Sequence, residues 1–242
     1  MTTRHWGPMV VRGCIAAVFA VVSHTAFAQY DEPREFTPLE SRFIAAGILD
    51  REFLPRDSNT MPDSAAIRYR NYMPVISFHQ GAFSITFGYT RYTRGGVSKE
   101  GVFFGSMFSR DLPLVAGRTH TFSIPICLAA DFSKAESAGP KRDNFNIASL
   151  GIGTGFRYQY RSPSIDASVH AIGMVHYSFE GLSTGSGSST ALDCDAHLVI
   201  KSIHIGEGIA LGYRFRAQQW SLSDTRFDYR STHHGPYIGV LL

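Results

Sequence analysis

Histidines and carboxylates recur at alternate positions along two neighbouring segments in the C-terminal half of the chain. These side chains are Asp166, His170, His176 and Glu180 in the first segment and Asp193, Asp195, His197 and Lys201 in the second. An imidazole held by a carboxylate is the core of many general-base arrangements, and imidazoles with carboxylates can also bind a metal ion. The candidate catalytic residues are His176, Asp195 and His197.

The pairing of the two segments decides which of these groups meet. One antiparallel register places His176 opposite Asp195 and Met174 opposite His197, but a slip of one residue would invert the whole face. The same residue types are also expected in any polar interior, because buried charges must be paired. This structural interpretation needs no cofactor and no metal, and we predict neither.

Two further motifs resemble functional sites without the context that such sites need. Residues 181–185, Gly-Leu-Ser-Thr-Gly, match the G-x-S-x-G nucleophile pattern, which requires a strand-to-helix elbow. Here the pattern opens a Ser/Gly run that is typical of a flexible loop, so Ser183 is not expected to be catalytic. His233 and His234 fall in a predicted loop, where a lone histidine pair is usually solvated.

The elements that must position the first cluster are predicted from strict alternation over residues 144–180. In both halves of this range one parity is apolar, as in Leu150, Ile152 and Phe156, and the other holds glycine and polar residues. Only a strand puts alternate residues on opposite faces. Long strands with one apolar and one polar face suit a barrel wall between lipid and a wet interior.

The N-terminus has the features of a secretory signal. Arg4 and Arg12 precede a short apolar stretch at 15–22, and Ala26-Phe27-Ala28 is a small-x-small cleavage site. We therefore predict a cleaved signal peptide at 1–28.

The rest of the chain is predicted to be a short N-terminal periplasmic segment, 29–41, followed by one β-barrel domain, 42–242. The whole chain has 23 Lys and Arg against 20 Asp and Glu, and the predicted signal holds two of the basic residues and no acidic one. The mature chain is therefore nearly neutral, and no basic patch indicates nucleic-acid binding. No window after residue 28 resembles a transmembrane helix, so a membrane-spanning form must be a closed barrel.

Ten strands are predicted, which makes the fold class all-β, an antiparallel up-and-down transmembrane β-barrel. The ranges are 42–50, 72–79, 82–92, 99–109, 120–132, 146–160, 164–179, 191–204, 206–222 and 235–242. The first is the least certain, because Thr37-Pro38-Leu39-Glu40 is a capping box that could start a helix. An eight-stranded barrel with an N-terminal helix is the alternative.

The connections and the aromatic residues follow a barrel pattern. Short turns at 80–81, 161–163 and 205–208 alternate with longer polar loops, and segment 111–119 falls on the short side. Outer-membrane barrels have short periplasmic turns and longer outer loops. The longer loops are 51–71, 93–98, 133–145, 180–190 and 223–234. Aromatic residues gather near the predicted strand ends, as interfacial belts would.

The polar parity predicts a filled interior. Arg157, Arg214 and Arg216 can balance the carboxylates across a narrow lumen, and glycines on the same faces make room for long side chains from the opposite wall. Barrels of this size have interiors about filled by side chains, so a wide pore is not expected. Cys127 lies on the polar parity and Cys194 on the apolar one, which argues against a disulfide between them.

Taken as a whole, the chain resembles small bacterial outer-membrane β-barrel proteins in its signal, alternation, turn pattern and aromatic placement. The resemblance is one of class. It implies a closing strand with alternating aromatics and a terminal Phe that the barrel assembly machinery recognises; residues 235–242 keep Tyr237 but end in Leu242. Ten strands is also the number in the omptin proteases, which use Asp and His at the outer rim, but no motif here carries an omptin residue over.

The sequence leaves three functions open, two for a membrane barrel and one for a soluble protein. The first is a non-enzymatic barrel with a filled polar lumen in the bacterial outer membrane, with membrane lipid and the barrel assembly machinery as partners. Its outer loops would bind an unknown partner, or the barrel would support the envelope. The second is a membrane-embedded hydrolase or lipid-modifying enzyme that uses the lumenal His and Asp residues. The third is a soluble exported lipocalin-like β protein, which would place its polar faces outward.

Overall fold

A computed structural model describes residues 41–55, 67–94, 97–137, 144–180, 185–201, 208–223 and 228–242. These ranges form ten strands. In chain order they are β1 (Arg42–Pro55), β2 (Tyr69–Gln80), β3 (Phe83–Arg94), β4 (Val97–Ala116), β5 (His120–Ser137), β6 (Asn144–Arg161), β7 (Ile165–Glu180), β8 (Gly185–Lys201), β9 (Gly208–Leu222) and β10 (Tyr229–Leu241). Within the described ranges no helix is long and apolar enough to cross a membrane.

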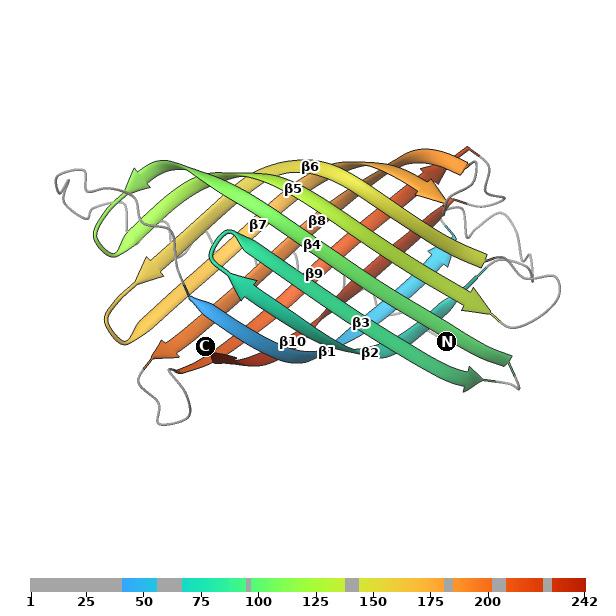
Figure 1. Ribbon diagram of the computed structural model, residues 1–242, viewed down its shortest axis with the longest axis horizontal. Helices are drawn as coiled ribbons and strands as arrows, with labels where there is room; N and C mark the ends of the chain where they lie inside the picture. The colour runs from blue at the N-terminus through green and yellow to red at the C-terminus, as the bar shows by residue number, and fades with distance from the viewer. Residues whose placement is uncertain are drawn as a thin grey trace, which may run out of the picture. The chain divides into compact units, whose positions relative to one another are not determined.

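The ten strands close into one antiparallel barrel. Each strand pairs with its neighbours in sequence, and β1 pairs with β10 from Phe43 opposite Leu241 to Pro55 opposite Tyr229, so that the blue and dark red strands lie side by side in Figure 1. Every strand therefore has a paired neighbour on each side, although β2 and β3 pair only from Val75 opposite Gly88 to Gln80 opposite Phe83. We call the end that holds Arg42 and Leu241 the terminal end and the opposite end the distal end.

The first strand settles the choice between ten strands and eight with a helix. Arg42–Pro55 pairs with β2 on one side and β10 on the other, and its residues alternate between buried and exposed over the whole length. A barrel with this segment as a helix would leave β2 and β10 unpaired, so the ten-strand prediction is confirmed. The capping box at 37–40 and the predicted signal at 1–28 lie outside the described residues.

Most strands run further than predicted, at the expense of the predicted loops. β5 continues to Ser137, β8 begins at Gly185 and β10 begins at Tyr229, so much of 133–145, 180–190 and 223–234 is strand. The Ser/Gly composition of residues 185–190 was misleading because β7 offers a partner strand for the whole stretch. Only the connection between β1 and β2 remains long.

The turn predicted at 111–119 is also mostly strand. Asp111 to Ala116 continues β4 and pairs with β5, with a register shift between Pro113 and Val115. A β-bulge of this kind accommodates Pro113, which cannot donate a ladder hydrogen bond.

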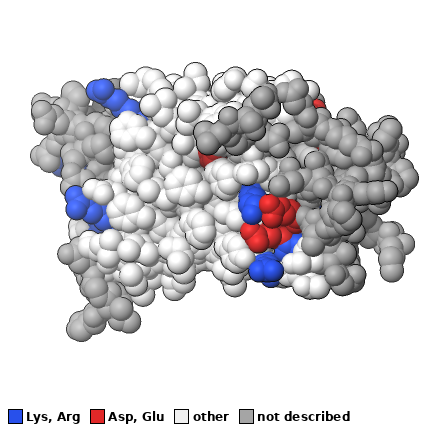
Figure 2. Space-filling model, turned by 45° about the vertical axis from the view of Figure 1, so that its right-hand side comes forward, with Lys and Arg blue, Asp and Glu red and all other residues white. Residues whose placement is uncertain are grey.

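The two faces of the wall differ in polarity as predicted. On β6, Leu150, Ile152 and Phe156 are 57%, 61% and 72% exposed, whereas Ser149 and Arg157 are buried inside. Figure 2 shows a wall that is largely uncharged in its middle, with charged side chains toward the two ends. An apolar exterior around a polar interior is the arrangement of a lipid-facing barrel and the reverse of a soluble one.

Exterior aromatic residues form two groups at different heights. His120, Phe122, Tyr158 and Tyr160 contact one another near the terminal end, and exposed Tyr72, Tyr89 and Tyr177 lie near the distal end. Two such girdles toward the ends of the wall fit the predicted interfacial belts, although exposed Phe87 and Phe104 lie between them.

The lumen is packed, and its distal end is apolar. A buried cluster there is formed by Phe53, Ile67, Tyr69, Ala135, Phe145, Ile147, Trp220, Leu222 and Tyr229. Phe53 contacts four of the other aromatic rings, with centroids 4.9–6.2 Å apart. We call this group the distal plug, because it fills the lumen where the strands end.

The cysteines and glycines clarify how the lumen is filled. Cys127 is buried inside and Cys194 is on the outer parity, and the two form no disulfide, as predicted.

A methyl group added at Gly151 would meet the His176 ring, and one added at Gly212 would meet the Tyr237 ring. Both rings come from the adjacent strand, so these glycines make room for neighbours and not, as predicted, for the opposite wall.

Candidate functional site

The register of β7 and β8 differs from the predicted one. His170 lies opposite Asp195 and His176 lies opposite Ser189, so the predicted pairing of His176 with Asp195 is wrong. The cause is the start of β8 at Gly185, which pairs with Glu180 and shifts every other pair along the strands. Ser183 lies outside the described residues.

His176 belongs to a charge network in the middle of the lumen. Its Nε2 lies 3.1 Å from Asp131 Oδ2, although the two atoms are not aligned as a hydrogen bond. Arg216 donates to the same Asp131 carboxylate and, at 3.3 Å, to Asp193. All four side chains are buried. Since Arg216 binds both carboxylates, this network has the composition of a packed polar interior.

A second buried cation lies between this network and the distal plug. Arg51 donates to Ser133 Oγ at 2.7 Å and to the Val102 carbonyl at 3.1 Å. Its guanidinium also lies over the rings of Phe53 and Tyr69, 5.8 and 5.7 Å from their centroids. Hydrogen bonds together with ring faces replace water around this charge.

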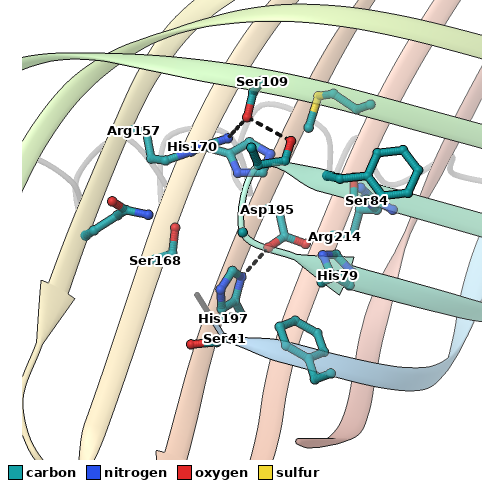
Figure 3. Close-up of a pocket in the computed structure, with 16 residues that line it drawn as sticks. Ser41, His79, Ser84, Ser109, Arg157, Ser168, His170, Asp195, His197 and Arg214 are labelled. Atoms are coloured by element: carbon teal, nitrogen blue, oxygen red, sulfur yellow. Dashed lines mark hydrogen bonds and ion pairs between the residues drawn. The ribbon is translucent and has the colours of Figure 1, made fainter. Parts of the chain in front are cut away.

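Asp195 and His197 come together at the terminal end of the lumen, a contact within β8 that the predicted register did not include. His197 Nδ1 lies 2.8 Å from Asp195 Oδ1, and the Tyr237 hydroxyl donates to both carboxylate oxygens at 3.0 Å. Figure 3 shows His79 and Arg214 beside the same carboxylate. The His197 side chain keeps 17% of its surface exposed, whereas Asp195 is almost fully enclosed.

These groups line a cavity of about 50 Å³ near the terminal end. Hydroxyl groups of Ser41, Ser84, Ser109 and Ser168 contribute to its lining, together with Gln159 and the side chains described above. The volume admits a few waters or a group of similar size. This cavity is the candidate functional site.

A buried ion pair forms one side of the cavity. Arg157 donates to both oxygens of Asp111 at 2.8 Å and to Ser109 Oγ at 3.0 Å. The sequence predicted a charge-balancing role for Arg157 but missed its partner, because Asp111 was assigned to a turn. The continuation of the β4 alternation beyond Arg110 was the available signal.

The two histidines that were predicted to lie in a loop, His233 and His234, have structural roles in a strand. His233 and His234 lie in β10 and not in a loop. The buried His233 ring packs against Phe103 with centroids 4.6 Å apart, and His234, on the outer face, is hydrogen-bonded to the Tyr213 hydroxyl at 2.7 Å. In the described part of the chain no group of three or more His, Cys, Asp or Glu side chains is placed to hold a metal ion.

Comparison with known proteins shows no family for this chain. No family model matches the chain, and no curated protein matches it. The outer membrane protease OmpT from Escherichia coli aligns over 87% of this chain and 99% of its own, with 7% identity and a TM-score of 0.37. Neisserial surface protein A aligns over 83% and 97%, with 10% identity and a TM-score of 0.33.

A further match is an outer-membrane enzyme of another kind. The outer membrane phospholipase A from Escherichia coli aligns over 88% of this chain and 94% of its own, with 8% identity and a TM-score of 0.23. The matches thus include enzymes and other barrels alike. The ten-strand closure itself is seen directly in the strand pairing of this chain.

Proposed function

We propose that this protein is a non-conducting outer-membrane barrel that supports the bacterial envelope, with its terminal end in the periplasm and its distal connections facing outward. The observation that carries the proposal is the filled lumen. The distal plug fills one end, and the network of Asp131, His176, Asp193 and Arg216 fills the middle with paired charges. A water-filled pore would leave such side chains hydrated and apart.

The exterior supports lipid as the direct partner. The middle of the wall is apolar and the two aromatic girdles flank it, a pattern that fits the polarity of a bilayer. The closing strand β10 ends in alternating exposed Ile238, Val240 and Leu242, which supports recognition by the barrel assembly machinery despite the missing terminal Phe. The distal connections are the proposed contacts with an outer partner.

Conductance in a planar bilayer tests the proposal. The protein is extracted from membranes in detergent, and heat-modifiable migration on a gel first shows that the barrel is folded. We expect no lasting conductance steps under conditions in which a general porin, the positive control, gives them. Stable channel steps from the folded protein would contradict the proposal, and a chain that stays soluble without detergent would contradict the membrane location.

A further inference from the structure

Five neighbouring strands bring one row of side chains to the lumen face beside the terminal cavity. The strand registers place Gln159 opposite Ser168, Ser168 opposite His197, His197 opposite Gly212 and Gly212 opposite Tyr237. All five positions have the parity that faces inward. The row thus sets a serine hydroxyl directly beside the histidine that Asp195 holds.

Tyr237 and Gly212 fix the acidic end of this row. Because Gly212 has no side chain, the Tyr237 ring passes over it, and its hydroxyl reaches both oxygens of Asp195 on the strand beyond. A carboxylate oxygen can only accept, so Nδ1 of His197 must be the protonated nitrogen at the 2.8 Å contact. In the neutral ring Nε2 is then the basic nitrogen, available to take a proton.

Ser168 lies directly opposite His197 on the neighbouring strand. Side chains directly opposite each other on antiparallel strands have Cβ atoms about 4.5 to 5.5 Å apart, which lets a serine Oγ reach a neighbouring imidazole by rotation about χ1. Both residues line the same cavity, and Figure 3 shows Ser168 next to His197. Gln159, on the other side of Ser168, brings an amide N–H donor to the same place.

We propose that Ser168, His197 and Asp195 form a hydrolytic site for short-chain carboxylic esters, open to the compartment at the terminal end. In this site Ser168 is the nucleophile, His197 the general base and acid, and Asp195 and Tyr237 are positioning residues. Gln159 donates to the oxyanion. The cavity of about 50 Å³ restricts the acyl group to the size of an acetyl group.

The reaction balances without any further cofactor. Ser168 Oγ attacks the ester carbonyl carbon while its proton passes to His197 Nε2; the bond from the carbonyl carbon to the alcohol oxygen breaks, and His197 returns the proton to the leaving alcohol. Water then attacks the acyl-serine, gives its proton to His197, and the carboxylic acid leaves as Ser168 regains its proton. This activity goes beyond the proposed envelope role and is compatible with it, because a closed barrel can carry a site at its mouth.

Hydrolysis of p-nitrophenyl acetate by the folded full chain in detergent tests the proposal. We expect turnover by the wild type and a loss of at least about 100-fold in Ser168→Ala, the size expected when a nucleophile is removed. Ser231→Ala is the matched control, since Ser231 is a lumen-facing serine as buried as Ser168 but lies outside the cavity. It should retain activity within about twofold, and heat-modifiable migration checks that each variant folds.

Two more readouts separate catalysis from structure. Mass spectrometry after acid quenching should find the acetyl group on the peptide that contains Ser168, and Tyr237→Phe should lower kcat more than it raises KM because it only loosens Asp195. A folded wild type that hydrolyses the ester no faster than Ser168→Ala overturns the proposal. Equal activity in Ser168→Ala with acetyl found elsewhere overturns it too, and neither result affects the conductance test.

Discussion

Arg216 lies between two buried carboxylates, Asp131 and Asp193, in the middle of the lumen. Replacing it by methionine keeps most of the side-chain volume but leaves both carboxylates without their shared cation. Because breaking a buried pair leaves an uncompensated charge, we expect Arg216→Met to lower the free energy of unfolding by about 3 to 5 kcal/mol. Urea titration of the vesicle-folded barrel, followed by the fluorescence of buried Trp220, measures the change.

The control for this prediction is an ion pair of similar geometry on the outer wall. Arg70 Nε donates to Asp50 Oδ1 at 3.0 Å, but the Arg70 side chain is 65% exposed. An exposed pair contributes at most about 1 kcal/mol, so Arg70→Met should shift the titration little. Equal shifts in the two variants would show that the lumen is hydrated and that its charges are not a packed core.

At the scale of residues, the sequence predicted which side chains face the lumen better than it predicted their partners. Alternation was enough to place Asp195, His197 and Arg157 on the inner face, where the structure has them. Partners depend on register, and register depends on where each hairpin closes. The chain beyond Glu180 was interpreted as a loop, so His176 was assigned to Asp195 although it lies beside Asp131.

The hairpin of β6 and β7 offers a test of how closely neighbouring strands are packed. An added methyl group at Gly151 would overlap the His176 ring, whereas at Gly173, on the outer face, the nearest atom is the Thr154 carbonyl oxygen at 4.0 Å. Overpacking costs about 1 to 3 kcal/mol, so Gly151→Ala should destabilise the barrel by that amount in the same urea titration.

Gly173→Ala is the matched variant for this hairpin. Its added methyl group meets open space, and the substitution reduces the freedom of the unfolded chain, which can stabilise a protein by about 0.4 to 1 kcal/mol. We therefore expect no loss of stability. If the two alanine variants behave alike, the close approach of His176 to Gly151 does not constrain the fold.

All ten strands were predictable at the scale of elements, but their ends were not. Period-two patterning continues through β6 and β7 with little interruption, and both were found almost whole. The ends of β5, β8 and β10 carry Ser, Gly, Lys and His, whose local preference is for turns. Pairing with a neighbouring strand overrides that preference, and a partner strand is not visible in a local window of sequence.

At the scale of the whole molecule, the same alternation sets both faces of the barrel wall, since alternate residues face the lumen and the exterior. Residues of the inner parity form the ion pairs, the distal plug and the cavity beside Asp195. Residues of the outer parity form the apolar exterior of the wall. Because one set of residues cannot face both ways, the polarity of the outer face decides between a membrane and a soluble protein. The closed topology, in which every strand pairs with two neighbours, is what a bilayer requires.

A charge placed on the outer wall measures that polarity directly. Ile152 is at the centre of β6 and is 61% exposed. If lipid covers this position, Ile152→Arg should lower the free energy of unfolding in phospholipid vesicles by about 2 to 4 kcal/mol, the cost of a guanidinium near the bilayer midplane. Thr93→Arg, also on the outer face but one residue from the distal end of β3, should cost at most about 1 kcal/mol. A wall that faced water would tolerate both substitutions equally, so the difference between the two variants, and not the size of either alone, tests the membrane location.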